Sequence, residues 1–135
     1  MQATTYGFGR KLSIPFDEAI GAVKAALKTE GFGVLTEIDV RKTMKEKLGA
    51  DFRPYVILGA CNPPLAHQAL SADLDVGLLL PCNVVVREAG DRVVVEAIDP
   101  GAMSRLEDRP EIVDVASEAR DRLSAALDRT VLQEA

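Results

Sequence analysis

The chain has 135 residues, the length of one ordinary domain, and 47% of its residues are hydrophobic while 27% are charged. This composition argues against intrinsic disorder. The formal net charge of −5 argues against a general nucleic-acid-binding protein, because contacts with phosphates require a basic surface.

The first third of the chain predicts a strand, a helix and a second strand. Residues 6–14 alternate between apolar and polar side chains, the pattern of a half-buried strand. Pro15 suits the first turn of a helix, and the apolar spacing over residues 16–27 continues as an amphipathic helix that ends at Gly31. Residues 32–40 alternate again and predict the second strand.

The middle of the chain predicts a helix, a strand and another helix. Residues 41–48 form a short helix with only two apolar residues on one side, so we expect it on the surface. Residues 55–58 are apolar without alternation, which is typical of a strand covered on both faces or held in a dimer. Asn62 is a good N-cap and Pro63 a good first residue for a helix that runs to about Asp73.

The last part predicts two strands and a helix. Residues 76–86 form the longest apolar stretch, and Pro81 within it removes a backbone donor, which predicts a bulge or a sheet edge. Residues 88–91 predict a hairpin turn into a strand that ends at 99–101, and a helix starts near Asp108. The apolar face of that helix consists of Ile112, Val115, Ala116, Ala119, Leu123 and Leu127.

Together these elements predict a single α+β domain over residues 1–135. Their order is β-α-β-α-β-α-β-β-α, with a mainly antiparallel sheet packed against helices. We find no internal repeat, linker or low-complexity segment.

Four segments in order resemble a known family. They read GFGVLTEIDV at 31–40, FRPYVILGACNP at 52–63, LPCNVVV at 80–86 and AIDP at 97–100. Over nearly the whole chain the sequence is similar to the family called domain of unknown function 302. The resemblance implies a compact α+β fold and a homodimer, and it implies no established activity.

The two cysteines are expected to be free thiols. No apolar run approaches the roughly 20 residues that span a bilayer, so we expect no membrane partner. The N-terminus lacks the basic and apolar regions of a signal peptide, which predicts a cytoplasmic protein. In that compartment a structural disulfide is the minority interpretation.

Cys61 is the main candidate site residue. It lies between the end of a predicted strand and a predicted helix N-terminus, where backbone N–H groups and the helix dipole lower the pKa of a thiol. Such strand ends are also common ligand sites. The alternative is that Cys61 fills space in the core, as cysteines commonly do.

The other candidates are Asn62, His67 and Cys82. Asn62 already has a structural role as the helix cap. His67 lies about one turn into the same helix and would pair with a thiolate, although a solvent-facing histidine is the better interpretation. The preferred interpretation of Cys82 is a small core side chain. A bulge at Pro81 would instead turn it toward a site.

A metal site is not predicted from one chain. A structural zinc site needs four ligands, whereas the chain has two cysteines and one histidine. Carboxylates such as Asp73, Asp75 or Asp99, or a second subunit, would have to contribute, and Met103 would matter only for a soft metal such as Cu(I).

The leading functional hypothesis is a homodimer that binds a small molecule or an ion in a pocket near Cys61. One alternative is a thiol-dependent redox or nucleophilic enzyme that uses Cys61 with His67 or Cys82. Another is a structural or regulatory dimer without pocket chemistry. The sequence identifies no cofactor and no reaction.

Overall fold

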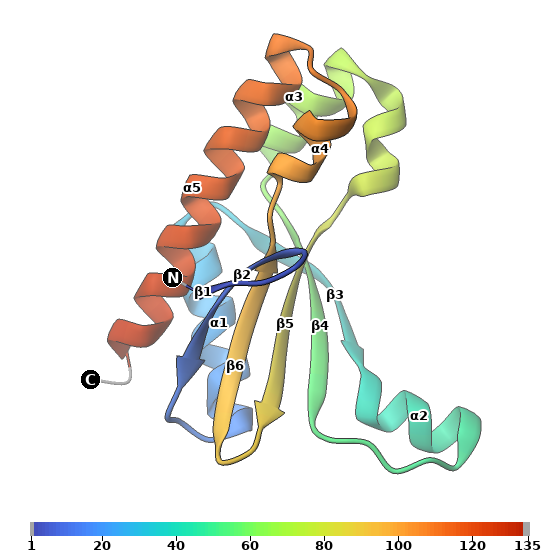
Figure 1. Ribbon diagram of the computed structural model, residues 1–135, viewed down its shortest axis with the longest axis vertical. Helices are drawn as coiled ribbons and strands as arrows, with labels where there is room; N and C mark the ends of the chain where they lie inside the picture. The colour runs from blue at the N-terminus through green and yellow to red at the C-terminus, as the bar shows by residue number, and fades with distance from the viewer. Residues whose placement is uncertain (1, 134–135) are drawn as a thin grey trace.

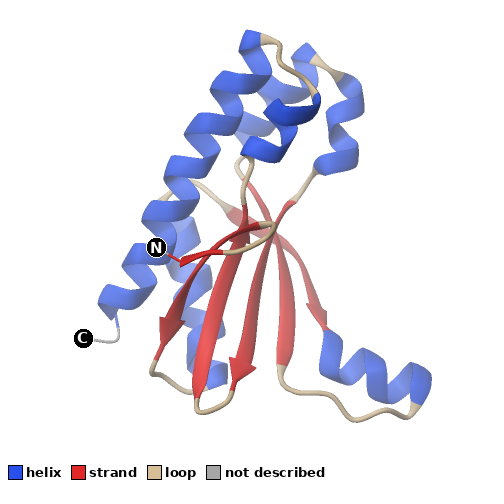
Figure 2. Ribbon diagram, viewed as in Figure 1, coloured by secondary structure: helices blue, strands red, loops and turns tan. Residues whose placement is uncertain are grey.

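The computed structural model describes residues 2–133 and consists of a six-stranded sheet with helices on one face and at one end (Figures 1 and 2). The strands are β1 (Gln2–Ala3), β2 (Gly7–Leu12), β3 (Gly33–Asp39), β4 (Tyr55–Cys61), β5 (Cys82–Ala89) and β6 (Arg92–Ile98). The helices are α1 (Phe16–Thr29), α2 (Val40–Leu48), α3 (Pro63–Ala72), the 3-10 helix η1 (Leu74–Leu79), α4 (Gly101–Leu106) and α5 (Pro110–Gln133).

The sheet is antiparallel, with the strand order β1-β2-β6-β5-β4-β3. The predicted α+β fold and the predicted order of elements are confirmed, and β1, η1 and α4 are additional short elements. None of the helices within residues 2–133 combines the length and apolar character needed to cross a membrane.

Local sequence signals set several element boundaries. Gly31 follows α1 with a φ of 84°, a left-handed conformation that favours glycine, as predicted for a helix end. The Asp39 side chain accepts a hydrogen bond from the backbone N–H of Lys42 and caps α2. α2 has no buried residue, which confirms the predicted surface helix. It projects from the lower end of the sheet in Figure 1.

Only one face of the sheet is covered by helices. α1 and α5 pack on that face, and Val56 and Leu58 of β4 are buried against it. Tyr55 and Ile57 point to the other face and are partly exposed. The prediction that residues 55–58 are covered on both faces is therefore wrong within one chain, because an antiparallel sheet with a single helical layer leaves its second face open.

The apolar stretch from residue 76 to 86 is not one strand. Residues 74–79 form η1, whose first turn is capped by the Asp73 side chain, and β5 begins only at Cys82, after the cis bond between Leu80 and Pro81. Pro81 has no N–H to donate to a neighbouring strand, so β5 begins at the residue after it. The predicted bulge or edge at Cys82 is wrong: β5 is an internal strand, and the irregularity lies in β3 between Val34 and Thr36.

The buried residues form two clusters. The sheet cluster joins α1, the C-terminal half of α5 and the covered face of the sheet. The helical cluster joins α3, η1, α4 and the N-terminal half of α5 at the upper end of the molecule in Figure 1. Among the described elements, α5 alone contributes buried residues to both clusters.

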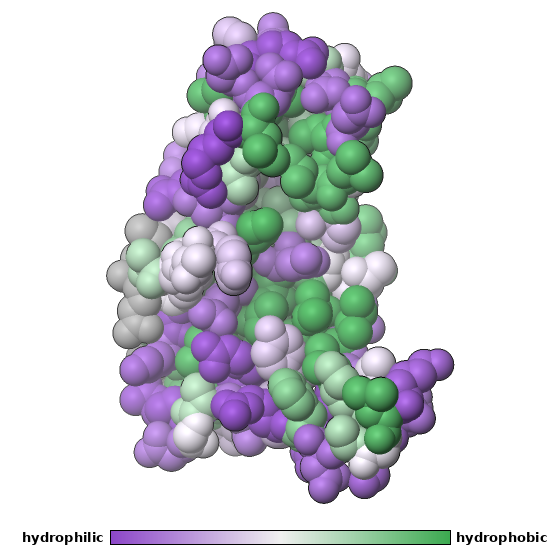
Figure 3. Space-filling view, turned by 45° about the vertical axis from the view of Figure 1, so that its right-hand side comes forward, coloured by the Kyte–Doolittle hydropathy of each residue, from purple (hydrophilic) through white to green (hydrophobic). Residues whose placement is uncertain are grey.

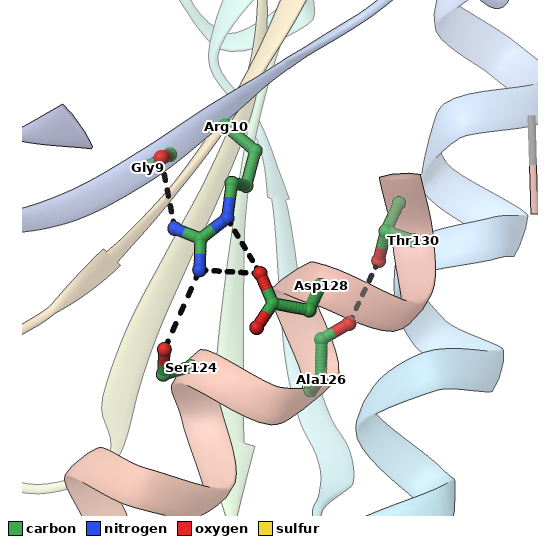
Figure 4. Close-up of polar contacts among 6 residues, drawn as sticks. All are labelled: Gly9, Arg10, Ser124, Ala126, Asp128 and Thr130. Carbon is green, nitrogen blue, oxygen red and sulfur yellow. Dashed lines mark hydrogen bonds and ion pairs between the residues drawn. The ribbon is translucent and has the colours of Figure 1, made fainter. Parts of the chain in front are cut away.

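Arg10 of β2 fixes the C-terminal half of α5 to the sheet (Figure 4). Its Nε and Nη2 donate to one carboxylate oxygen of Asp128 over 2.9 and 2.6 Å, and Nη2 also donates to the hydroxyl of Ser124 over 3.4 Å. Its Nη1 donates to the carbonyl oxygen of Gly9. The Arg10 side chain is largely buried, whereas the Asp128 side chain is 60% exposed, so solvent still screens this ion pair.

Candidate functional site

Strand pairing brings Cys61 and Cys82 together. In the antiparallel ladder between β4 and β5, Ala60 lies opposite Cys82, so Cys61 is one residue from that pair. Both cysteines are free thiols. Twenty residues of sequence that include α3 and η1 therefore separate two cysteines that the sheet places on neighbouring strands, one step out of register.

Both thiols line a cavity of about 360 Å³ at the end of the sheet. The cavity lies between the sheet cluster and the helical cluster, because its walls contain members of each. Its lining residues are Phe32, Leu35, Thr36, Ala60, Cys61, Asn62, Leu65, Ala66, Ala69, Leu70, Gly77, Leu80, Pro81, Cys82, Met103, Val115 and Ala119. The walls are therefore apolar apart from Thr36, Asn62 and the two thiols.

Asn62 has a structural role at this cavity. Its side-chain oxygen accepts a hydrogen bond from the N–H of Leu65 over 3.3 Å, which confirms the predicted cap of α3. Its side-chain nitrogen donates to the carbonyl oxygen of Glu30 over 3.3 Å and so connects α3 to the end of α1. Through these two hydrogen bonds Asn62 holds the cavity wall in position between α1 and α3.

Gly59 allows a close approach between three segments beside the cavity. A Cβ atom at this position would overlap the Thr36 hydroxyl of β3 and would press against the ring of Pro81. The absence of a side chain lets the irregular part of β3 and the segment before β5 both close on β4. This approach places Thr36 and Pro81 in the cavity wall.

Cys82 is a buried, protonated thiol at neutral pH. Burial, and after it the charge of nearby Cys61, raises the pKa of Cys82 from an ordinary 9.0 to about 11. Cys61, by contrast, is only partly buried at the last position of β4, two residues before the first residue of α3. The two thiols of one cavity therefore differ in access to solvent.

His67 does not line this cavity. Positions 65, 66, 69 and 70 of α3 face it, whereas His67 is exposed on the other side of the helix, as the helical period requires. His67 instead lines a shallow polar hollow with Gln68, Ser71, Ala72, Arg109, Glu111 and Asp114. The structure thus unites Cys61, Asn62 and Cys82, and the hypothesis that His67 assists Cys61 has no support in the geometry.

Two of the carboxylates considered for a metal site, Asp73 and Asp99, have partners within the fold. Asp99 accepts hydrogen bonds from the N–H of Gly101 and from Arg120, and Asp73 caps η1. Within residues 2–133, no group of three or more His, Cys, Asp or Glu side chains is placed to hold a metal ion. Met103, in contrast, lies in the wall of the cavity with both cysteines.

Some residues of the cavity wall are predicted from the sequence only as core residues. Val115 and Ala119 belong to the apolar face predicted for the last helix, and periodicity cannot distinguish a residue that fills a core from one that lines a cavity. Thr36 and Ala66 were not singled out at all, because neither carries a chemical signal. The one sequence signal that indicates the cavity is the position of Cys61 next to the helix cap Asn62.

Comparisons with known proteins agree on one family. The family model described as "Domain of unknown function DUF302" matches residues 8–130. The solved structure described as "Crystal structure of uncharacterized conserved protein DUF302 from Bacillus stearothermophilus" is similar, with a TM-score of 0.86 and 34% sequence identity. The match covers 93% of this chain and 98% of that one. No curated protein matches the chain.

Proposed function

The chain belongs to the family described as domain of unknown function DUF302, which assigns no activity, and on that premise we propose a function from its cavity: the binding of a small, largely apolar molecule. The observation that carries the proposal is a cavity of about 360 Å³ whose walls are almost entirely apolar. Ligand sites in proteins commonly have about 300–1,000 Å³ and mostly hydrophobic walls with a few polar groups.

Exposed apolar side chains beside the cavity support the same proposal. Leu35 lines the cavity and is still 69% exposed, so the cavity opens to solvent next to it. Leu78 of η1 is 88% exposed, beside Gly77 of the cavity wall. Figure 3 shows hydrophobic surface around the upper helices and again over the uncovered side of the sheet. Exposed apolar surface next to a cavity is typical of a site that binds apolar ligands.

A thiol-dependent enzyme is the weaker candidate. The partial exposure of Cys61 in the cavity favours it. Nucleophilic thiols, however, are usually paired with a proton acceptor such as histidine, and the described cavity wall contains no histidine, carboxylate or lysine. A binding site without catalysis explains the apolar composition of the cavity walls with fewer assumptions.

An uncharged fluorescent probe tests the binding proposal directly. N-phenyl-1-naphthylamine is expected to bind one molecule per chain with a saturable rise in fluorescence, because its rings would leave water for the apolar cavity. Ala66→Phe places a ring inside the cavity and should weaken probe binding at least about tenfold by occupying its space.

Gln68→Phe is the matched control, since it adds a ring two positions further along α3 on the exposed side, outside the cavity. Equal loss of probe binding in both variants, or no saturable binding by the unaltered chain, would contradict the proposal.

We also propose that two chains pair in solution. The family resemblance suggested this, and the open face of the sheet carries partly exposed Ile57 and Ile38 at paired positions of β4 and β3. Sedimentation at micromolar concentration should give a mass of twice 14.5 kDa. Ile57→Arg should shift the measured mass toward that of a single chain, because pairing would remove water from the charged arginine side chain at an energetic cost. A mass of 14.5 kDa for the unaltered chain would refute pairing.

A further inference from the structure

We propose that the cavity binds one Cu(I) ion between the sulfur atoms of Cys61 and Cys82, with the thioether of Met103 as a third ligand. The inference goes beyond the proposed function, because it adds an ion site to the wall of the same cavity. Its basis is the gathering of sulfur: the chain has two cysteines and three methionines, and both cysteines and one methionine line this one cavity.

The strand register makes a bridged pair of cysteines possible. In an ideal ladder Cys61 would project to the face opposite Cys82, since neighbouring residues alternate. Cys61 is, however, the last residue of β4, where the sheet ends and the cavity begins, and both residues line that cavity.

A metal bridge suits this arrangement better than a disulfide. A disulfide requires sulfur atoms about 2.05 Å apart with restricted dihedral angles. A thiolate-bound metal lies about 2.3 Å from each sulfur and so joins sulfurs that are roughly 4–5 Å apart. Because Cys61 and Cys82 lie one step out of register on neighbouring strands, the longer metal bridge demands less of their geometry than a disulfide does.

The donor set selects a soft ion. Thiolate and thioether ligands favour Cu(I), whereas carboxylate, carbonyl and water ligands favour Mg²⁺, Ca²⁺ and Mn²⁺. The described wall offers no carboxylate or imidazole, and three sulfurs fall short of the four ligands of structural zinc. On binding, both thiol protons leave to solvent, two sulfur–copper bonds form and copper stays in the +1 state. The resulting single negative charge lies beside the N-terminus of α3, whose dipole favours it.

Transfer of copper from a coloured chelator tests the inference on the full chain. Reduced protein under anaerobic conditions should take one Cu(I) per chain from its bathocuproine disulfonate complex, with loss of the complex's colour. Loss of a residue that only hydrogen-bonds to a metal ligand weakens metal affinity about 10–100-fold. Loss of a ligand itself should cost more, so Cys61→Ser and Cys82→Ser should each weaken copper affinity at least about 100-fold. Met103→Leu should weaken it about tenfold, and X-ray absorption should show only sulfur neighbours around copper.

Met44→Leu is the matched control, because Met44 lies on surface helix α2, outside the cavity. Its affinity should equal that of the unaltered chain. Cys61→Ser alters a partly exposed position, and retained binding of N-phenyl-1-naphthylamine would show that its cavity is intact. Failure of the unaltered chain to take copper, unchanged uptake by a Cys61→Ser/Cys82→Ser double variant, or nitrogen or oxygen as the main copper ligands would each overturn the copper site. Probe binding by copper-free protein reports separately on the proposed function.

Discussion

Replacement of Leu58 by alanine is expected to lower the free energy of unfolding by about 2–5 kcal/mol. Leu58 is fully buried in the sheet cluster, on the internal strand β4 that leads directly to Cys61. The substitution removes apolar contacts and leaves a cavity that neighbouring strands cannot close completely. Urea denaturation followed by circular dichroism measures the change, with the slope of the transition kept as a check on two-state behaviour.

Leu48→Ala provides the matched control, since it makes the same chemical change on α2 at a side chain that is 74% exposed. Its effect should stay within about 0.5 kcal/mol, as is usual for surface positions. Similar losses at the two positions would contradict the packing of Leu58 in the sheet cluster.

Alkaline conditions are expected to destabilise the fold through Cys82. Burial and the neighbouring Cys61 raise the pKa of Cys82 to about 11 in the folded chain, against an ordinary 9.0. Between these pH values the unfolded chain releases a proton that the folded chain retains, so stability falls as the pH rises. The contribution of the Cys82 thiol to the free energy of unfolding is fully present below about pH 9 and is lost by about pH 11. It amounts to at most roughly 2–3 kcal/mol.

The measurement compares the pH dependence of unfolding in Cys82→Ala with that of the unaltered chain. Tyrosine and lysine residues also titrate in this range, so the difference between the two slopes isolates the thiol. Cys61→Ala should keep the larger part of the dependence, because burial is the main cause of the raised pKa. Parallel slopes in the unaltered chain and Cys82→Ala would contradict the burial of this thiol.

The fold was largely predictable because its boundaries rest on local chemistry. Pro15, Gly31 and Asn62 each mark a helix start or end through their own backbone or side-chain preferences. The structure confirms the positions of Gly31 and Asn62, whereas Pro15 is the N-cap of α1 and lies one residue before the predicted first turn. Local signals failed where several short elements follow one another. The apolar run after Val76 gave no reason to expect a 3-10 turn, which depends on the cap by Asp73 and on packing of Val76 among the upper helices.

The candidate site was predictable only in part. Cys61 and Asn62 could be placed at a strand end and a helix cap from neighbouring residues alone. The nearness of Cys82 follows from the register of β4 and β5, which requires α3 and η1 to return the chain to the sheet. The preferred interpretation of His67 as a solvent-facing histidine is confirmed, because the helical period turns its side chain away from Cys61.

The division of the buried residues into two clusters has a consequence for motion. α5 alone contributes buried residues to both clusters, and Arg10 fastens its C-terminal half to the sheet. Regions with separate packing commonly open in separate cooperative units, so we predict that α3, η1 and α4 open locally while the strands remain hydrogen-bonded. A molecule can therefore reach the space between the clusters without global unfolding. Its binding would slow amide hydrogen exchange in the upper helices much more than in the sheet.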